Sequence, residues 1–546
     1  MCRRSSVSGS DDASFRKGRA NLLLSVIDAG YALSLIPARL AFARATLRVE
    51  AFQQRHLQRT LQKNQRTVYG VQHRFAEIHS LADYQRRVPV VGYDEVAPWV
   101  TRLAEGEKHL LTAEPVRLFE PTSGSTGQAK LIPYTQGLLS EFSAATSAWL
   151  ADLYAHYPLS GTTSYWSLSP ATSKGHATPA GIPVGFADDT EYFGRLTRWA
   201  VRQKLAVPVS VRCAPSFEAW RESTVRSLLA APDLGLISVW SPTFLSLLMR
   251  YLEANFESLV ATLPKRHEAA VRARVEQADG ITALALWPKL RLLSCWTEAS
   301  AQLFVPELMR WFVGVPIQGK GLVATEGIVS LPWGNTDAGS VAAITSHFLE
   351  LQPLDQATHA PLGVHQARVG ASYEPIVTTA GGLYRYRLGD VVTCTGFVGQ
   401  APLLRLLGRR DKRSDLCGEK LDALAVEQAL QAVCTEVGIT VQFALVAPLL
   451  EPRPAYCLLV ESEADAASLQ QVAVGLERRL CDNFHYQYCR EVGQLGPVSL
   501  RRTERGFERY AQVLSARGVA LGSIKPMGLT AELGWPARLQ PTPTNV

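Results

Sequence analysis

The stretch EPTSGSTGQAKLIPYT, residues 120–135, limits what this chain can fold into more than any other feature of its sequence. Glycines allow a backbone to approach a ligand closely, and consecutive N–H groups can form a concavity that binds anions. Serine and threonine hydroxyls add donors, and Lys130 supplies a point charge suited to phosphate. We therefore predict a phosphate-binding loop made by Ser123, Gly124, Ser125, Thr126 and Gly127.

Two better-known phosphate motifs do not account for this loop. Counted from Gly124, the second glycine of the P-loop pattern falls on Ala129, and Leu131 replaces its serine or threonine. The stretch GKGLVA, residues 319–324, matches the glycine pattern of dinucleotide-binding folds. That pattern requires a following helix and an acidic residue about 20 positions later, but Pro332 follows closely and position 339 is glycine. An isolated Gly/Ser cluster is more typical of a surface turn, so other residues must support the assignment.

The composition excludes several classes of protein. With 546 residues, 47% of them hydrophobic and 19% charged, the chain is typical of globular proteins with about three or four structural units. The net charge is +7, and no basic block alternates with aromatic residues, so we predict no nucleic-acid partner. The nine cysteines are scattered and form no CxxC pair. They favour free thiols in a reducing cytoplasm over a zinc site or a disulfide framework.

The N-terminal region contains the apolar stretch NLLLSVIDAGYALSLIPARLAFARA, residues 21–45. A membrane span needs about 20 predominantly apolar residues. Asp28, Arg39 and Arg44 interrupt this stretch, and Pro37 lies inside it. We predict an amphipathic helix that docks on the body of the protein, with a membrane-surface contact as the alternative, and neither a transmembrane segment nor a signal peptide.

Hydrophobic periodicity predicts a mixed α/β architecture. Residues 45–85 have a helical pattern, and a second helix with apolar residues at helical spacing is expected to begin after Thr135. The runs LGLISVW, LRLLSCW and YEPIVTT are short and apolar, as in buried strands of an α/β sheet. Beyond residue 408 we expect a charged linker and then a compact α+β unit, with strands VQFALVAP and AYCLLVE and the helix DAASLQQVAVGLERRL.

Four further segments supply residues for handling a nucleoside triphosphate. Thr325 and Glu326 are adjacent in ATEG, and Asp390 follows a glycine in GLYRYRLGDVV. The charged stretch after residue 407 carries Arg409, Asp411 and Lys420, and GSIKP carries Lys525. Carboxylates can bind Mg²⁺ or ribose hydroxyls, and lysines offset charge that develops on phosphate. Each residue alone is more often structural, so the prediction depends on the combination.

These segments, in this order, resemble the motifs of adenylate-forming enzymes, and more closely those of the auxin-responsive acyl acid–amido synthetases (the Gretchen Hagen family) and their bacterial relatives. The similarity covers about residues 45–530 and includes VPVVGYDEVAPWV, TSGSTGQAKLIPYT, GLVATEG and GLYRYRLGDVV. It implies an α/β fold with a large N-terminal adenylate-forming domain and a smaller, mobile α+β C-terminal domain. The expected divisions are an N-terminal extension with a docking helix (1–44), the ATP- and acid-binding domain (45–407), a hinge linker (408–411) and the C-terminal domain (412–546).

The resemblance also implies roles for individual residues. Residues 123–127 and Lys130 would hold the triphosphate of ATP, Thr325 would lie near the α-phosphate, and Glu326 would bind Mg²⁺. Asp390 would hold the ribose, with Arg409 and Lys420 completing the nucleotide site. Lys525 would stabilise the adenylation transition state, and Asp411 lies where the superfamily has its hinge. The motifs ATEG and TSGSTGQ depart from the plant pattern towards the general adenylating one, which makes the second half-reaction less secure than the first.

The resulting functional hypothesis is an ATP-dependent ligase that adenylates a carboxylic acid and transfers the acyl group to an amine, expected to be an amino acid. The alternatives are a ligase that forms a CoA thioester and a non-catalytic nucleotide-binding protein. We expect a cytoplasmic monomer. Trp149, Trp240 and Trp296 are candidates for lining an apolar or aryl-acid pocket, although aromatic residues at such spacing more often belong to the core.

Overall fold

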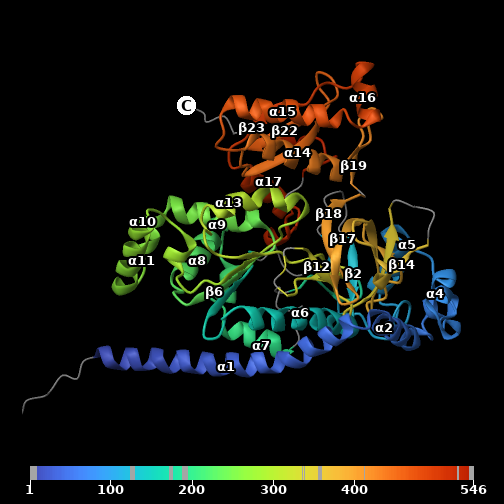
Figure 1. The fold of residues 1–546 in the computed structure, drawn as a ribbon, viewed down its shortest axis with the longest axis horizontal. Coiled ribbons are helices and arrows are strands. Elements are labelled where there is room, and N and C mark those ends of the chain that lie inside the picture. The colour runs from blue at the N-terminus through green and yellow to red at the C-terminus, as the bar shows by residue number, and fades with distance from the viewer. Residues whose placement is uncertain are drawn as a thin grey trace, which may run out of the picture.

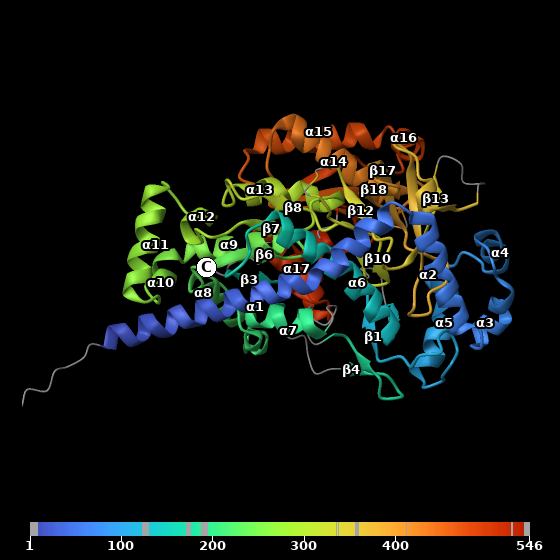
Figure 2. The same ribbon diagram turned by 60° about the horizontal axis from the view of Figure 1, so that its bottom comes forward.

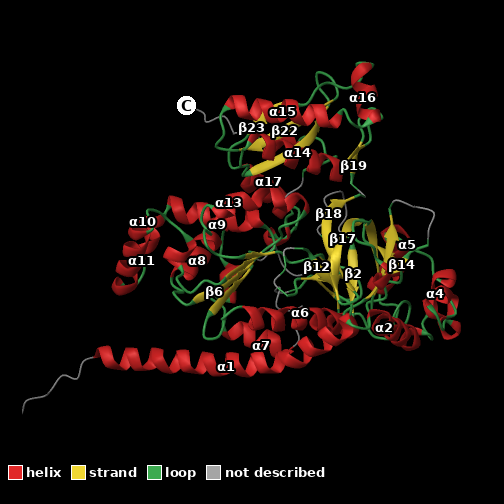
Figure 3. Cartoon of the chain, in the orientation of Figure 1, coloured by secondary structure: helices red, strands yellow, loops and turns green. Residues whose placement is uncertain are grey.

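The computed structural model describes residues 9–122, 130–170, 176–186, 195–334, 336, 338–354, 360–410, 412–525 and 528–539. Two β-containing regions lie side by side above the long helix α1 (Gly9–Thr46), and a third unit formed by the C-terminal part of the chain lies above both (Figure 1). Helices and strands occur throughout all three (Figure 3). The mixed α/β fold class predicted from the sequence is confirmed.

A parallel four-stranded sheet forms the centre of one region, with strand order β3-β6-β7-β8. Its central strand β6 is buried along its whole length, as expected for a parallel strand covered on both faces. Helices α8 (Phe217–Leu229) and α9 (Pro242–Ala254) pack beside it. The strand bounds are β3 Thr163–Trp166, β6 Leu234–Ser238, β7 Leu292–Ser294 and β8 Ile317–Gln318.

The neighbouring region contains an antiparallel sheet with the order β11-β12-β18-β17-β15-β13-β14, and β16 pairs with β15 at its side. The run YEPIVTT, interpreted from the sequence as a strand of a buried α/β sheet, belongs here as β15. Apolar periodicity identifies a strand but does not determine the direction of its neighbours. The bounds are β11 Ser330–Leu331, β12 Ser340–Ala342, β13 Phe348–Pro353, β14 Leu362–Gly363, β15 Ser372–Thr378, β16 Tyr386–Arg387, β17 Asp390–Val398 and β18 Ala401–Arg409.

Two short hairpins lie near these sheets. Strands β1 (Leu118–Pro121) and β2 (Leu131–Tyr134) pair antiparallel and flank the predicted phosphate loop, and β5 (Pro183–Val184) and β4 (His176–Ala177) extend this sheet. Strands β9 (Val323–Ala324) and β10 (Gly327–Ile328) form the second hairpin. The dinucleotide-like stretch 319–324 therefore leads into a hairpin and not into a helix.

The C-terminal unit is built on the sheet β21-β22-β23, preceded by the short pair β19–β20. Helices α14 and α15 pack against the sheet around a shared core. The bounds are β19 Arg413–Ser414, β20 Leu421–Asp422, α14 Ala423–Val437, β21 Phe443–Leu449, β22 Ala455–Glu461, α15 Ala466–Leu480, α16 Phe484–Glu491, β23 Ser499–Arg502 and α17 Gly506–Ala516.

The helices that remain cover the outer faces of the sheets or connect their strands. Helix α6 (Gln136–His156) begins at Thr135, whose hydroxyl accepts a hydrogen bond from the backbone N–H of Leu138, as predicted for a cap. The other bounds are α2 Val49–Asn64, α3 Val68–Gln72, η1 Phe75–Glu77, α4 Leu81–Arg87, α5 Tyr93–Ala104, α7 Arg195–Gln203, η3 Val209–Cys213, α10 Phe256–Val260, α11 Lys265–Gln277, α12 Ala283–Leu286, η4 Ala299–Phe304, α13 Val305–Met309, η5 Val364–Gln366, η6 Leu521–Ser523 and α18 Trp535–Arg538.

Helix α1 lies against α6 and α7 (Figure 2). Asp28, which interrupts the apolar stretch in the sequence, is fully buried, and its carboxylate lies 2.7 Å from the Nζ of Lys204. The same carboxylate accepts a hydrogen bond from the backbone N–H of Gly161 at 2.7 Å. The polar interruption is thus an internal anchor for the helix. In the described part of the chain, no helix has the length and apolar character needed to cross a membrane.

Candidate functional site

The β1–β2 hairpin closes just before the predicted phosphate loop. The backbone N–H of Thr122 donates to the carbonyl of Lys130 at 2.8 Å, so the two ends of the loop lie next to each other. The residues predicted to hold phosphate, 123–127, lie outside the described residues. The structure therefore describes only the hairpin that carries these residues.

Lys130 lies at the base of this loop and faces Tyr93 at the start of α5. Its Nζ is 5.4 Å from the centroid of the Tyr93 ring, within cation–π range. The Tyr93 hydroxyl accepts a hydrogen bond from the backbone N–H of Leu131 at 2.8 Å. Burial raises the pKa of Tyr93, and the charge of Glu326 adds to the increase. The lysine and the predicted metal-binding carboxylate therefore share one aromatic neighbour.

Thr325 and Glu326 form the two-residue turn of the β9–β10 hairpin, since Ala324 pairs with Gly327. The hydroxyl of Tyr134, at the end of β2, donates to the carbonyl of Thr325 at 2.6 Å. This bond joins the turn to the hairpin that carries the phosphate loop. Two motifs almost 200 positions apart in the sequence are thereby brought together.

Glu326 interacts electrostatically with several charged residues. Desolvation raises the pKa of its carboxyl group, while the positive charges of Arg409 and Lys525 act in the opposite direction. The neighbouring carboxylate of Asp390 raises the pKa further. These interactions place three of the other predicted site residues within electrostatic reach of Glu326.

Asp390 and Arg409 are positioned by the antiparallel pairing of β17 with β18, in which they lie directly opposite each other. Asp390 is buried and follows Gly389, whose φ of +80° is readily adopted only by glycine. The guanidinium of Arg409 donates to the carbonyl of Leu388 at 3.0 Å.

Strand β18 extends through Arg409, so the predicted hinge, 408–411, overlaps the end of this strand. Asp411 itself is outside the described residues.

Lys525 reaches the site from the C-terminal unit. It is exposed, and its Nζ lies 5.3 Å from the centroid of the Trp296 ring. The helix before it, η6, contacts the N-terminal region, where the backbone N–H of Gly522 donates to the Ser169 hydroxyl at 2.7 Å. Any other residue at position 522 would clash with this hydroxyl, because its Cβ would lie 2.8 Å from the Ser169 oxygen.

Lys420 is placed differently from the other predicted residues. It lies between β19 and β20 with φ of +48°, is exposed, and makes no hydrogen bond or ion pair within the described residues. The turn is held by the buried Glu419, whose carboxylate accepts from the backbone N–H groups of Leu416 and Cys417. This arrangement does not join Lys420 to Glu326.

The three predicted tryptophans lie in one cluster. The ring centroids of Trp240 and Trp296 are 5.8 Å apart, and Trp149 is 5.9 Å from Trp166. The sequence analysis missed both Trp166 and the buried Lys320, which lies between these rings. Lys320 belongs to the dinucleotide-like stretch 319–324. It follows the end of β8 by two residues, where hydrophobic periodicity does not indicate whether a side chain is buried.

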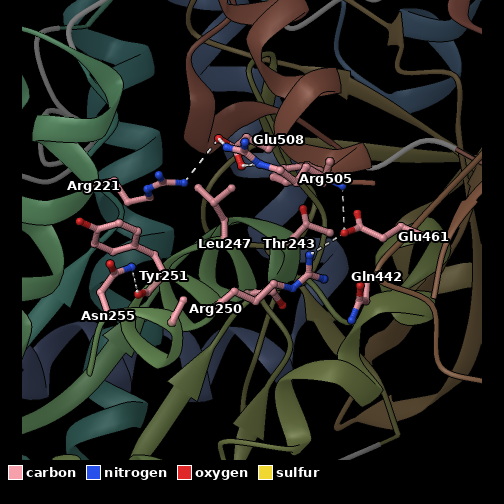
Figure 4. A pocket seen from close by; sticks show the side chains of 13 residues that line it. Arg221, Thr243, Leu247, Arg250, Tyr251, Asn255, Gln442, Glu461, Arg505 and Glu508 are labelled. Carbon is pink, nitrogen blue, oxygen red and sulfur yellow. Dashed lines mark hydrogen bonds and ion pairs between the residues drawn. The ribbon is translucent and has the colours of Figure 1, made fainter. Parts of the chain in front are cut away.

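A cavity of about 340 Å³ lies between α9 and the C-terminal unit, and no residue predicted for the nucleotide site lines it (Figure 4). Charged residues from both sides meet there: Arg221 lies 3.5 Å from Glu508, and Arg250 lies 3.4 Å from Glu461. These are contacts between the N-terminal region and the C-terminal unit. In the arrangement that these contacts stabilise, the charge of Lys525 acts on Glu326.

Comparisons with known proteins agree with the architecture. Family models for the GH3 N-terminal, central and C-terminal domains match residues 39–317, 340–409 and 424–532. An indole-3-acetic acid-amido synthetase of Oryza sativa subsp. indica is 24% identical, with 88% of each chain covered. A jasmonoyl–L-amino acid synthetase of Nicotiana attenuata is 24% identical, covering 87% of this chain and 90% of the relative. A solved acyl acid amido synthetase has a TM-score of 0.80 at 18% identity, covering 92% of this chain and 95% of that one.

Proposed function

Because this chain belongs to the GH3 family, we propose that it is an ATP-dependent acyl acid–amido synthetase. The observation that carries the proposal is the convergence of Glu326, Asp390, Arg409 and Lys525, which the sequence scatters over 200 positions. A carboxylate pair flanked by two cations suits a magnesium-bound nucleotide better than a purely structural network. The enzyme is a ligase that forms an amide bond through an acyl-adenylate.

The proposed nucleotide site takes its residue roles from the motifs that this chain shares with adenylate-forming enzymes. Residues 123–127 and Lys130 hold the triphosphate, and Thr325 lies near the α-phosphate. Asp390 accepts hydrogen bonds from the ribose hydroxyls, with Arg409 beside it and Lys420 contributed by the C-terminal domain. Glu326 fits a Mg²⁺ ligand because desolvation penalises its ionised form, and a hard cation would offset that penalty. When bound, Mg²⁺ would neutralise part of the negative charge of the phosphates.

In the first half-reaction, the carboxylate of the acid attacks the α-phosphorus of ATP. A P–O bond forms to the acid, the bond to the β-phosphate oxygen breaks, and pyrophosphate leaves. Negative charge increases on the oxygens around the phosphorus in the transition state, where an ammonium group is most useful. Lys525 supplies that ammonium group and acts as the catalytic lysine.

In the second half-reaction, the amine of an amino acid attacks the acyl carbon, loses a proton and expels AMP. Lys525 is needed in the first step and obstructs the second, so the C-terminal domain, 412–546, turns about the linker 408–411 and Asp411 between them. Helix α1, which makes up the described part of the N-terminal extension, 1–44, docks on the large domain, 45–407. The amide product contains no residue of the protein, and no covalent enzyme intermediate is required.

The enzyme is proposed to act in the cytoplasm as a monomer on two small molecules, an acid and an amino acid. In the described part of the chain the cysteines are free, as a reducing compartment permits. If amino acids had no effect on turnover, the chain would be either a ligase that uses CoA as the acceptor or a nucleotide-binding protein without catalytic activity.

The test is ATP-dependent pyrophosphate release with a panel of carboxylic acids, measured alone, with mixed amino acids and with CoA. We expect release with one class of acid, acceleration by an amino acid, and a new amide detected by mass spectrometry. Acceleration by CoA alone would replace the amide with a thioester. Absence of release with every acid, while ATP still binds, would make the chain a nucleotide-binding protein.

A further inference from the structure

Lys320 is a buried cation enclosed by tryptophans. Its Nζ lies 5.0 Å from the ring centroid of Trp149, 5.1 Å from that of Trp240 and 5.9 Å from that of Trp166. It donates a hydrogen bond to the hydroxyl of Ser238 at 2.7 Å, and only 7% of the residue is exposed. Lysine is rarely buried to this degree unless its charge is used.

These groups gather at one edge of the parallel sheet. Trp166 ends β3, Ser238 ends β6 and Gln318 ends β8, while Cys295 directly follows β7. Ligands of α/β sheets bind outside the carboxyl ends of parallel strands, which is the edge that carries Lys320. Burial raises the pKa of the Cys295 thiol to about 12, so this thiol stays neutral at physiological pH.

The rings around Lys320 differ from those of a closed core. Trp149 is nearly buried, and its indole N–H donates to the side-chain oxygen of Gln318 at 3.0 Å. Trp166, Trp240 and Trp296 are only half-buried, so part of each ring remains accessible. An aromatic ligand would gain by covering these exposed surfaces.

The cluster is continuous with the proposed catalytic lysine. The Trp296 ring contacts both Lys525 and Trp240, and the Trp240 ring in turn contacts Lys320. A chain of two indoles therefore connects the two lysines. An aromatic acid beside these indoles could present its carboxylate towards Lys525 and its opposite end towards Lys320.

We propose that Lys320 selects acids by binding a second oxygen acceptor at the end remote from the reacting carboxylate. The proposal rests on the amido-synthetase function and names its substrate class: aromatic acids that carry a hydroxyl or a second carboxylate. An ammonium group that has lost most of its water gains from an added oxygen partner. A site built around such a polar contact discriminates strongly against an analogue that lacks it.

The experiment compares wild-type protein with Lys320→Met, which keeps the length of the side chain and removes the charge. Matched acids are benzoate, its hydroxy derivatives and its carboxy derivatives. Binding is followed by quenching of tryptophan fluorescence, and adenylation by pyrophosphate release. The wild-type protein is expected to favour a substituted acid by at least tenfold in affinity, and Lys320→Met to bring that ratio near one. The surface variant Lys265→Met is the matched control and should keep the wild-type ratio.

Equal affinity of the wild-type protein for substituted and unsubstituted acids would overturn the proposal. An equal loss for all acids in Lys320→Met would do the same, because it would assign the lysine to packing. If Lys320→Met does not fold, Lys320→Arg and Ser238→Ala move the cation without removing it, and a changed ratio in either supports the proposal. A preserved ratio in both variants contradicts it. Selective binding without any pyrophosphate release would refute the amido-synthetase function but leave the selectivity of Lys320 standing.

Discussion

Glu326 is the proposed ligand of Mg²⁺, and its burial makes ionisation of its carboxyl group energetically unfavourable. Desolvation raises the pKa of its carboxyl group, so folding disfavours the ionised form. A carboxyl group with a raised pKa gives most stability below its ordinary pKa, and this contribution disappears as the pH rises through the folded-state value. This loss of stability falls on the residue that is proposed to bind the metal.

This reasoning predicts opposite effects of Glu326→Gln on stability and activity. The variant should lower the rate of pyrophosphate release by at least about a hundredfold, as loss of a major electrostatic contact does. Its Tm should equal or exceed that of the wild type at pH 8, with a smaller difference at pH 5. Calorimetry at the two pH values checks the second expectation. A lower Tm at pH 8 would assign the residue a structural role.

Lys525 is expected to act on the transition state and not on ATP affinity. Lys525→Ala should lower the adenylation rate by about two to three orders of magnitude while the Kd of ATP changes by less than about threefold. Single-turnover kinetics and ATP titration separate the two quantities. Lys265→Ala, on the exposed face of α11, is the matched control and should leave both unchanged. Parallel losses of rate and ATP binding would contradict the assigned role.

At the scale of residues, the sequence identified the charged candidates for the site but not the residues that surround them. Glu326, Asp390 and Lys525 stand in short motifs that can be read locally, and the charges of Asp390 and Lys525 act on Glu326, while their roles remain predictions. Lys320 and Trp166 had no such signal, because their neighbours come from α6, β3 and the end of β6. Lys420 was predicted from its motif, but its contact with the nucleotide remains a prediction.

At the scale of elements, α14 is linked to the segment that follows Lys525. Glu427 on α14 accepts a hydrogen bond from the backbone N–H of Gly528 at 3.2 Å. Desolvation raises the pKa of Glu427 to about 7, with Gly528 and Lys412 acting against the increase and Asp422 adding to it. This carboxyl group therefore changes charge near neutral pH, and its partner Gly528 lies three positions after the residue proposed as the catalytic lysine.

Glu427→Gln is expected to stabilise the protein in alkaline solution alone. The raised pKa means that the stability given by protonated Glu427 is present below about pH 4.5 and is lost as the pH rises through about 7. Glutamine stays neutral and can still accept from Gly528, so the variant should gain roughly 1–2 kcal/mol at pH 8.5 and almost nothing near pH 5. Denaturant unfolding at both pH values tests this, and a gain independent of pH would refute it.

The buried pair Asp28–Lys204 ties α1 to the end of α7, because Lys204 directly follows that helix. Burial lowers the pKa of Lys204, while the hydrogen bond and charge of Asp28 act in the opposite direction. Lys204→Met should destabilise the protein by about 3–5 kcal/mol, because it leaves a buried carboxylate without its cation. The double variant Asp28→Asn/Lys204→Met should recover more than half of this loss. Proteolysis of α1 and urea unfolding measure both, and equal losses in the single and double variants would argue against the pair.

Sequence patterns identified most elements but not all their neighbours. The cap at Thr135, the strands β6 and β21, and the helix α15 agree with the expected positions. These features depend on local periodicity and capping chemistry, which a sequence records directly. Membership of β15 in an antiparallel sheet depends on which distant strands lie beside it. The burial of Asp28 depends on a lysine 176 positions away, which local polarity could not reveal.

At the scale of the whole molecule, the family and fold class inferred from motifs are confirmed by the domain models and by the likeness to solved structures. The order of those motifs carries this information because it reflects one shared architecture. The motifs do not record how the C-terminal unit sits on the rest of the molecule. That arrangement depends on contacts such as Gly522 with Ser169 and Arg221 with Glu508, which lie outside every motif.

The arrangement of the two parts has a mechanistic consequence. Arg221 on α8 and Glu508 on α17 are largely buried on opposite sides of the interface, next to the cavity in Figure 4. The proposed rotation of the C-terminal domain must break this ion pair. The pair therefore favours the arrangement in which Lys525 approaches Glu326, and it opposes the second half-reaction.

Arg221→Met should separate the two half-reactions. It keeps the aliphatic contacts of the side chain and removes one charged hydrogen bond, which is worth about 1.5 kcal/mol or roughly tenfold in an equilibrium. We expect the adenylation rate to fall by about three- to tenfold, while transfer from preformed adenylate to the amine is unchanged or faster. Arg226→Met is the matched control, because Arg226 lies on the same helix and pairs with Glu222 in solvent. Rapid-quench measurement of each half-reaction decides the matter: an equal slowing of both, or the same effect in Arg226→Met, would show that the ion pair does not control the domain arrangement.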